Sequence, residues 1–321
     1  MKKQENNNFL NVLKVLIVIS IVIAAIFGKV VVNEDGTIQF LSDDNTQSVV
    51  SDALVNVDNL DGDLSIHFID VGQADSILIV QGEHNMLIDA GTNDAGKTVV
   101  DYINSQGIKD FDYVIGTHPH EDHIGGLDNV INNFNINTFF FPKATSNTKT
   151  FKDVVTAASK KGLKFTVPKV GSTYTLGDAK FEILAPNSES YESTNNYSIV
   201  IKLTYGNNKF VFTGDAETES EKEILANGTD LSADLLKIGH HGSYTSTSAK
   251  FLEAVNPKYA VICVGKANSY SHPVKSVMTR LKDKNIDVYR TDECGTVIAT
   301  SDGTNITFNV NKGTYNYIST K

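Results

Sequence analysis

THPHEDHIGG, residues 117–126, decides how this chain is interpreted, because it places four potential metal ligands within six residues: His118, His120, Asp122 and His123. The segment ends the apolar run DYVIGTH (112–118), which predicts a buried strand, and it opens a helix expected from Asp122. Residues two apart in an extended loop point the same way, so the first two histidines can bind one ion, while the Asp–His pair that turns into the helix faces a second. Imidazole and carboxylate without thiolate favour zinc, with manganese as the alternative. A histidine-rich surface turn is the competing interpretation.

Around this segment, the pattern from residue 64 onward alternates between strands and helices, with several consecutive hairpins. Helices are expected at 95–106, from Asp122, and at 150–161, 217–226, 246–254 and 273–284. Strands are expected at 65–71, 75–81, 85–91, 112–118, 180–184, 197–204, 209–213, 234–238, 258–263, 286–290, 295–300 and 305–310. This mixture predicts an α+β domain over 64–321, in which mixed sheets are covered by helices in layers.

The first 63 residues do not follow this pattern of strands and helices. Residues 9–28, FLNVLKVLIVISIVIAAIFG, approach the roughly 20 apolar residues of a bilayer-spanning helix. Lys2 and Lys3 precede this run, so the positive-inside rule predicts a cytoplasmic N-terminus (1–8), a transmembrane signal anchor (9–28) and an acidic tether (29–63). The expected location is the cell membrane, single-pass, with the domain outside the cytoplasm. A cleaved signal peptide, which would make the protein secreted, is the alternative.

Composition limits the function classes. The chain has 321 residues, 40% of them hydrophobic, which excludes collagen, coiled coil and wholesale disorder. A formal net charge of −10 means that any nucleic acid is held by local groups rather than by a basic face. Two cysteines, Cys263 and Cys294, exclude a disulfide scaffold and a thiolate zinc site; they either pair or remain two thiols. Nothing indicates an obligate protein partner.

The motif HxHxDHxGG resembles the signature of the metallo-β-lactamase fold, a four-layered αβ/βα sandwich with its metal site between two sheets. Six further segments resemble the hydrolase domain of ComEC-type competence proteins, and also exported teichoic-acid phosphorylcholine esterases. They are IDVGQADS (69–76), LIDAG (87–91), NNYSIVIKL (195–203), FTGD (212–215), KIGHHGS (237–243) and SYSHP (269–273). The resemblance covers nearly all of 64–321.

This resemblance implies a set of metal ligands. His118 and His120 would bind the first ion, Asp122 and His123 the second, and Asp215 would bridge them. His241 would complete the second site, although the choice between His240 and His241 is open. Many members of the family carry a further histidine for the first ion, where this chain offers only Asn195, Asn196 and Ser198.

The expected reaction is hydrolysis of a phosphodiester by a hydroxide bridging two metal ions about 3.5–4 Å apart. Asp122 would orient the nucleophile, and His240, His272 or Ser243 would stabilise charge or protonate the leaving group. His272, before Pro273, is expected to cap a helix and to face a phosphate.

Other residues are expected to support the site. Asp89 is expected to orient the metal-binding loops by accepting hydrogen bonds. The residues expected to contact substrate are Gln73, Asn196, Ser198 and Ser243.

The expected substrate is nucleic acid or a cell-envelope polymer such as teichoic acid. Two alternatives remain. One is a metal-binding accessory module for DNA uptake that lacks turnover. The other is a β-lactam or thioester hydrolase, which the fold permits.

Overall fold

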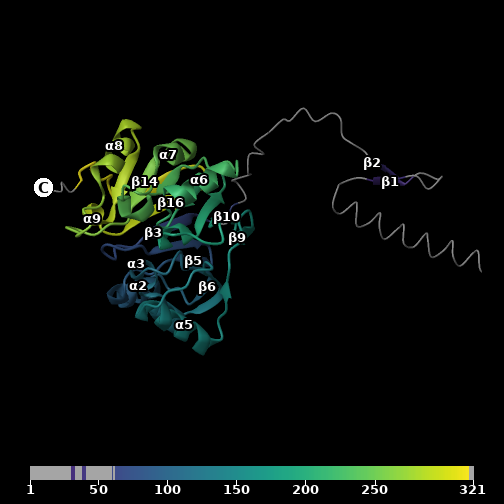
Figure 1. Ribbon diagram of the computed structural model, residues 1–321, viewed down its shortest axis with the longest axis horizontal. Coiled ribbons are helices and arrows are strands. Elements are labelled where there is room, and N and C mark those ends of the chain that lie inside the picture. The colour runs from purple at the N-terminus through teal and green to yellow at the C-terminus, as the bar shows by residue number, and fades with distance from the viewer. Residues whose placement is uncertain (1–29, 33–37, 41–59, 61, 318–321) are drawn as a thin grey trace, which may run out of the picture. The chain divides into compact units, whose positions relative to one another are not determined.

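The computed structural model describes residues 30–32, 38–40, 60 and 62–317 (Figure 1). The chain divides into two compact units, residues 1–53 and 54–321. In the first, β1 (Val30–Val32) and β2 (Ile38–Phe40) pair in antiparallel fashion within the predicted tether. The predicted cytoplasmic N-terminus and anchor, residues 1–28, lie outside the described residues. None of the helices described has the length and apolar character to cross a membrane.

The second unit contains two mixed β-sheets. The larger has the strand order β17-β16-β3-β4-β5-β6-β7-β8, and the smaller the order β15-β14-β13-β12-β11-β10-β9. The strands of the larger sheet are β3 (Leu64–Phe68), β4 (Ile77–Gln81), β5 (His84–Ile88), β6 (Asp110–Ile115), β7 (Asn135–Phe140), β8 (Phe165–Thr166), β16 (Val297–Ser301) and β17 (Ile306–Phe308). Those of the smaller sheet are β9 (Thr173–Leu176), β10 (Ala179–Ala185), β11 (Val200–Tyr205), β12 (Asn208–Phe212), β13 (Leu235–Lys237), β14 (Tyr259–Ile262) and β15 (Asp287–Arg290).

Helices flank both sheets. The group α6, α7 and α8 lies on one side of the unit, and α2, α3 and α5 lie on the other (Figure 1). The α-helices are α2 (Gly96–Ser105), α3 (Glu121–Ile124), α4 (Leu127–Asn133), α5 (Lys149–Lys161), α6 (Thr218–Ala226), α7 (Ala249–Val255), α8 (Lys275–Asp283) and α9 (Thr291–Cys294). Short 3₁₀ turns are η2 (Asn93–Ala95), η3 (Thr194–Tyr197) and η4 (Gly239–Gly242).

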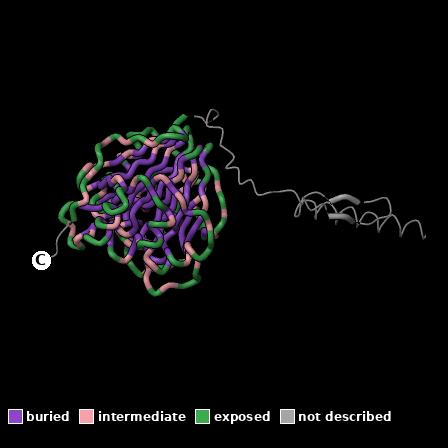
Figure 2. Tube along the Cα trace, turned by 90° about the horizontal axis from the view of Figure 1, so that it is seen from above, coloured by how far each residue is buried: buried purple, intermediate pink, exposed green. Residues whose placement is uncertain are grey.

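The alternation of side chains along each strand explains the layers. Ile77 and Ile79 of β4 join the core between the two sheets, whereas Leu78 joins the core beneath α2, α4 and α5. In the smaller sheet, Phe212 faces the central core and Val211 faces the helices α6, α7 and α8. Buried residues therefore fill the interior, with exposed residues along its outer loops (Figure 2). The expected α+β layering is confirmed: this is a helix–sheet–sheet–helix sandwich.

The expected single helix from Asp122 is wrong, because the chain forms two short helices that meet at Gly125 and Gly126. A side-chain carbon at position 125 would lie 2.2 Å from the backbone nitrogen of Asn93, and one at 126 would lie 2.3 Å from the carbonyl oxygen of Ala90. The glycines thus allow the ligand-bearing loop to approach the β5–α2 connection closely. The strands β7, β8 and β9 were not predicted.

Candidate metal centre

The predicted ligands meet where strands of both sheets end. His118 and His120 follow β6, and Asp122 and His123 lie in α3 directly afterwards. Asp215 follows β12, and the pair His240–His241 lies in η4, directly after β13. The two sheets are joined at this point by a hydrogen bond from the backbone N–H of Ile199 to the carbonyl of Thr117 (3.0 Å).

Four side chains form one compact group: Asp122, His123, Asp215 and His241 each offer a ligand atom within 4.8 Å of the others. His123 Nε2 lies 3.2 Å from Asp215 Oδ2, and His241 Nε2 lies 3.3 Å from Asp122 Oδ2. His241 Nε2 also lies 3.9 Å from Asp215 Oδ2. These residues are the predicted second-ion ligands together with the predicted bridging carboxylate.

The ring orientations of these two histidines fit metal coordination. His123 Nδ1 donates to Asp89 Oδ2 (2.7 Å), and His241 Nδ1 donates to the carbonyl of Cys263 (2.9 Å). The Nε2 atom of each ring is buried and forms no hydrogen bond within the described part of the chain. Binding one ring nitrogen to a protein acceptor leaves the other free as a ligand, which is the usual arrangement at metal-binding histidines.

The predicted first-ion ligands lie against this group. His118 Nε2 is 3.0 Å from His120 Nδ1 and 4.0 Å from Asp215 Oδ2. His118 Nδ1 faces two hydroxyls, Thr117 Oγ1 at 3.1 Å and Ser198 Oγ at 3.3 Å. Ser198 Oγ also accepts from the backbone N–H of Asp215 (3.0 Å). Ser198 therefore supports two of the predicted ligands from a fully buried position.

Electrostatics within the group favour a cation. Burial opposes a charge on His123, but the carboxylates of Asp215 and Asp89 raise its pKa well above the ordinary value. Burial likewise opposes a charge on His241, whereas Asp215 and Asp75 raise its pKa to about 10. The clustered carboxylates thus hold protons on both rings. A divalent cation would displace these protons, because imidazole ligates in its neutral form.

Asp89 lies where it was expected, under the ligand loop. Besides the bond from His123, its Oδ1 accepts from the backbone N–H of Thr117 (2.8 Å) and its Oδ2 accepts from Thr117 Oγ1 (2.7 Å). The carboxylate is fully buried, so these hydrogen bonds compensate for its loss of water. Asp89 therefore fixes both the loop backbone and the His123 ring.

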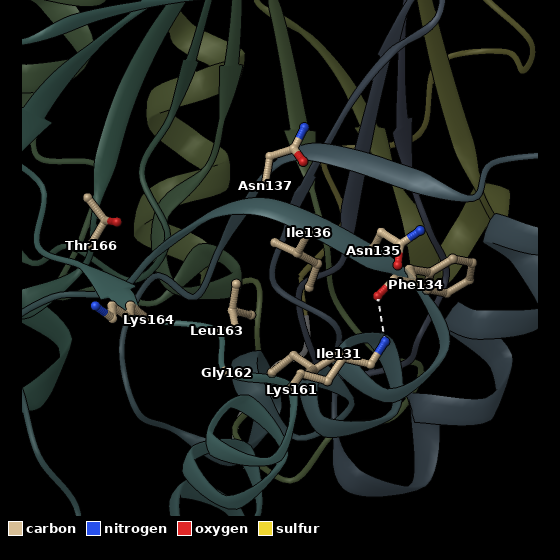
Figure 3. Close-up of a pocket in the computed structure, with 10 residues that line it drawn as sticks. All are labelled: Ile131, Phe134, Asn135, Ile136, Asn137, Lys161, Gly162, Leu163, Lys164 and Thr166. Atoms are coloured by element: carbon tan, nitrogen blue, oxygen red, sulfur yellow. Dashed lines mark hydrogen bonds between the residues drawn. The ribbon is translucent and has the colours of Figure 1, made fainter.

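A cavity of about 530 Å³ opens onto the group. Its lining combines the predicted residues Gln73, His120, Asp122, Asp215, His240, His241 and His272 with Thr92, Glu121, Asn195 and Tyr270. A second cavity, of about 460 Å³, lies between the end of α5 and β7 (Figure 3). It contains no histidine, cysteine or carboxylate, and Lys161 in it donates to the carbonyl of Phe134 (3.0 Å). The first cavity is therefore the candidate site.

His240 and His241 have different surroundings. His241 is 1% exposed, whereas the His240 side chain is 23% exposed and lines the cavity. His240 Nδ1 lies 3.0 Å from Thr245 Oγ1, and its Nε2 lies 3.6 Å from Asp215 Oδ2. Both residues have positive φ angles, 52° and 53°, which turn neighbouring side chains toward the same centre. The buried ring is thus the better-placed ligand, and the more exposed ring faces the cavity.

The expected helix cap at His272 is wrong. Helix α8 begins at Lys275 and its N-cap is Val274, so His272 lies in the preceding loop. Asn268 holds it there, because Asn268 Oδ1 accepts from the His272 N–H (3.0 Å) and Asn268 Nδ2 donates to its carbonyl (2.7 Å). Burial, followed by the charges of His241 and His240, lowers the His272 pKa to about 4. A neutral imidazole at the cavity wall results.

Three of the predicted substrate contacts lie outside the cavity lining: Asn196, Ser198 and Ser243. Asn196 Nδ2 donates to Glu219 Oε2 (2.8 Å), and its Oδ1 accepts from the Glu217 N–H (3.0 Å), so it supports the start of α6. Ser243 Oγ is 3.2 Å from Thr245 Oγ1. Only Gln73 of this set faces the cavity, and its Nε2 lies 3.5 Å from His272 Nδ1.

The sequence pattern of the Metallo-beta-lactamase superfamily matches residues 69–266, more than half of the chain. This protein therefore belongs to the metallo-β-lactamase superfamily. It is similar to "ComE operon protein 3" of Bacillus subtilis (31% identity over 250 residues, 72% of this chain and 32% of the relative) and to "Competence protein ComA" of Neisseria gonorrhoeae (30% over 228 residues, 70% and 30%). The chain thus spans about a third of the length of these ComEC-family relatives.

Solved structures resemble the chain more distantly. The metallo-beta-lactamase fold protein YhfI from Bacillus subtilis matches with 14% identity and a TM-score of 0.47, over 72% of this chain and 96% of that one. A putative metal-dependent hydrolase from Parabacteroides distasonis matches with 19% identity and a TM-score of 0.46, over 71% and 93%.

Proposed function

We propose that this protein is a metal-dependent phosphodiesterase that acts on nucleic acid or on a phosphodiester of the cell envelope. The observation that carries the proposal is the pair of buried, unbonded Nε2 atoms of His123 and His241, which lie beside the carboxylates of Asp122 and Asp215 at an open cavity. Similarity to competence proteins favours nucleic acid as the substrate, although these relatives are about three times as long as the matched segment.

The geometry supports the proposed ligand assignment. His123, His241 and Asp122 would hold one ion, His118 and His120 the other, and Asp215 Oδ2, which faces both histidine groups, would contact both. Zinc is the metal we expect, with manganese as the alternative. When bound, two divalent ions supply an acidified water molecule and stabilise charge on both sides of a displacement at phosphorus.

The remaining residues of the cavity would bind and orient the substrate. The uncharged His272 ring lies within 3.5 Å of Gln73, so the two can receive a phosphoryl oxygen from one side of the cavity. His240 faces the same space from the other loop, where its Nε2 can give a proton to a leaving oxygen. The buried carboxylates exclude anions from any position that lacks metal, so phosphate binding would require the loaded site.

We further propose that residues 9–28 anchor the protein in the membrane and that the catalytic unit lies outside the cytoplasm. The apolar run and the lysines before it support this location. Deleting residues 1–29 should transfer the protein from the membrane fraction to the soluble fraction. Recovery of the full chain in the soluble fraction at its full mass would contradict the anchor, and recovery at a mass lacking the first 30 residues would indicate a cleaved signal.

The catalytic proposal is tested by loading the full chain with zinc or manganese in parallel and following nitrophenolate release from bis(4-nitrophenyl) phosphate. We expect turnover that requires metal and disappears in Asp122→Ala. The matched control is Asp101→Ala, which removes an exposed carboxylate that pairs with Lys97 on α2. Bound metal with no turnover would favour the accessory module, and cleavage of a β-lactam or thioester alone would favour the other alternative.

A further inference from the structure

Among the large hydrophobic side chains of the described part of the chain, the two most exposed are tyrosines in loops that carry residues of the candidate site. Tyr244 is 74% exposed and Tyr270 is 67% exposed. Tyr270 lines the cavity itself. Tyr244 follows Ser243 in the loop that begins at His240. Exposed aromatic rings cost free energy in water, so their position beside a catalytic cavity suggests a ligand surface.

Ring contacts connect Tyr270 with two histidines of the cavity. The Tyr270 ring stacks on His272, with centroids 5.7 Å apart and planes 26° apart. His272 in turn contacts His240 edge to face at 5.6 Å. One face of Tyr270 is therefore supported by the site, while its high exposure leaves the remaining ring surface open to a partner.

The loop that carries Tyr270 is held in a defined conformation. Ala267 and Ser271 have positive φ angles of 49° and 61°, which cost free energy in residues other than glycine. Asn268 compensates by donating to the carbonyls of Gly265 (2.9 Å) and His272 (2.7 Å).

The same loop also packs against the turn that carries Gln73. A side-chain carbon at Gly265 would lie 2.6 Å from the backbone nitrogen of Gln73, so the two segments are in close contact. The Gly265 N–H donates to Gln73 Oε1 (3.0 Å). A ring fixed in this way loses little conformational entropy when it binds a planar group.

We propose that Tyr270 stacks on a nucleobase of single-stranded nucleic acid whose adjoining phosphodiester enters the cavity, an inference that rests on the proposed phosphodiesterase function. Base–aromatic stacking needs an open, supported ring face and tolerates any base. The net charge of −10 makes long-range attraction of a polyanion weak, which agrees with binding by such local contacts. Polyol-phosphate envelope polymers carry no planar aromatic group, so Tyr270 would select against them.

The experiment measures binding apart from cleavage. The full chain is loaded with zinc, and fluorescence anisotropy follows its binding to an oligothymidylate octamer and to an abasic strand of the same length, both made with phosphorothioate linkages that resist hydrolysis. We expect the base-bearing strand to bind more tightly. Tyr270→Ala should weaken binding of that strand by about 5-fold to 100-fold and leave the abasic strand unchanged. Tyr270→Phe should retain the affinity, because it keeps the ring.

Tyr317→Ala is the control, because Tyr317 is also exposed (39%) and does not line the cavity. Equal affinity for the two strands would overturn the inference, and so would an unchanged affinity of Tyr270→Ala for oligothymidylate. A glycerol-phosphate oligomer that binds as tightly as oligothymidylate would also overturn it. The proposed function is judged separately by nitrophenolate release. Turnover with base-independent binding would refute the stacking role alone, whereas base-dependent binding without turnover would refute the phosphodiesterase alone.

Discussion

Lys237 Nζ lies 2.7 Å from Asp75 Oδ2, and both side chains are almost fully buried directly behind the candidate metal ligands. The second oxygen of Asp75 lies 3.3 Å from His241 Nδ1. Burial opposes the charge on Asp75, but Lys237 and His241 lower its pKa to about 2, so the carboxylate stays ionised. The Asp75 carboxylate thus connects a buried cation, Lys237, with the His241 ring, which faces the proposed metal position.

This ion pair predicts a strong dependence of stability on each partner. Lys237→Met should lower the free energy of unfolding by about 3–5 kcal/mol, because it leaves a buried carboxylate without its counter-charge. The double variant Lys237→Met/Asp75→Leu should recover part of that loss. Urea unfolding of the metal-free proteins measures both values. A double variant less stable than the single one would contradict the explanation.

Asp89 is expected to act on metal affinity rather than on substrate. Asp89→Asn should weaken zinc binding by about 10-fold to 100-fold, because His123 loses the acceptor that fixes its tautomer. Competition with a coloured chelator measures this affinity. The matched control is Asp112→Asn. Asp112 Oδ2 lies 3.3 Å from Nδ1 of another histidine, His84, which lies in an exposed hairpin turn away from the candidate metal ligands. Equal effects of the two substitutions would refute the assignment.

The two neighbouring histidines should separate binding from turnover. His241→Ala should reduce zinc affinity at least about 100-fold, because it removes a buried ligand. His240→Ala should leave most of the zinc affinity intact and lower kcat, since its ring faces the cavity. Metal content and kcat, measured on the same samples, distinguish the roles. The reverse pattern would exchange the two assignments.

His67 predicts a pH dependence that is independent of the metal site. Burial lowers its pKa from 6.5 to about 4, and its ring nitrogens contact Tyr102 Oη (2.8 Å) and Ser65 Oγ (3.0 Å). Below pH 6.5 the unfolded chain therefore binds a proton that the folded protein does not, and stability falls until about pH 4. His67→Gln should flatten this part of the profile. Urea midpoints at pH 7 and pH 5 test the prediction, and parallel profiles for both proteins would contradict it.

The local pattern was enough to predict the cluster of His118, His120, Asp122 and His123, because polar residues directly after a buried strand lie at a sheet edge. Asp215 was predicted from the resemblance of FTGD to the ComEC-type hydrolase domain, and its position after a strand agreed with that. Contacts across the fold were not predictable in this way. The ion pair between Lys237 and Asp75 joins segments 162 positions apart. The sequence placed Asn196 near the site, but it could not show that the side chain turns toward α6.

The wrong or missing predictions of secondary structure have similar physical causes. Pro273 suggested that a helix starts there, but α8 begins two residues later, at Lys275. Asn268 holds His272 in the preceding loop through two hydrogen bonds to its backbone. The strand β7 was missed because Ile136 is the only apolar residue in Asn135–Thr138, and none of these four residues is buried. Its partner β8 has only two residues, too few for a periodic pattern.

The position of the ligands at the junction of the sheets also affects how the protein unfolds. His118 to His123 belong to the connections of one sheet, and Asp215 and His241 to those of the other. An ion bound to both sets is a cross-link between halves of the domain that are distant in sequence. Its binding free energy is lost when the halves separate, so the loaded protein should unfold as one cooperative unit and the metal-free protein less cooperatively.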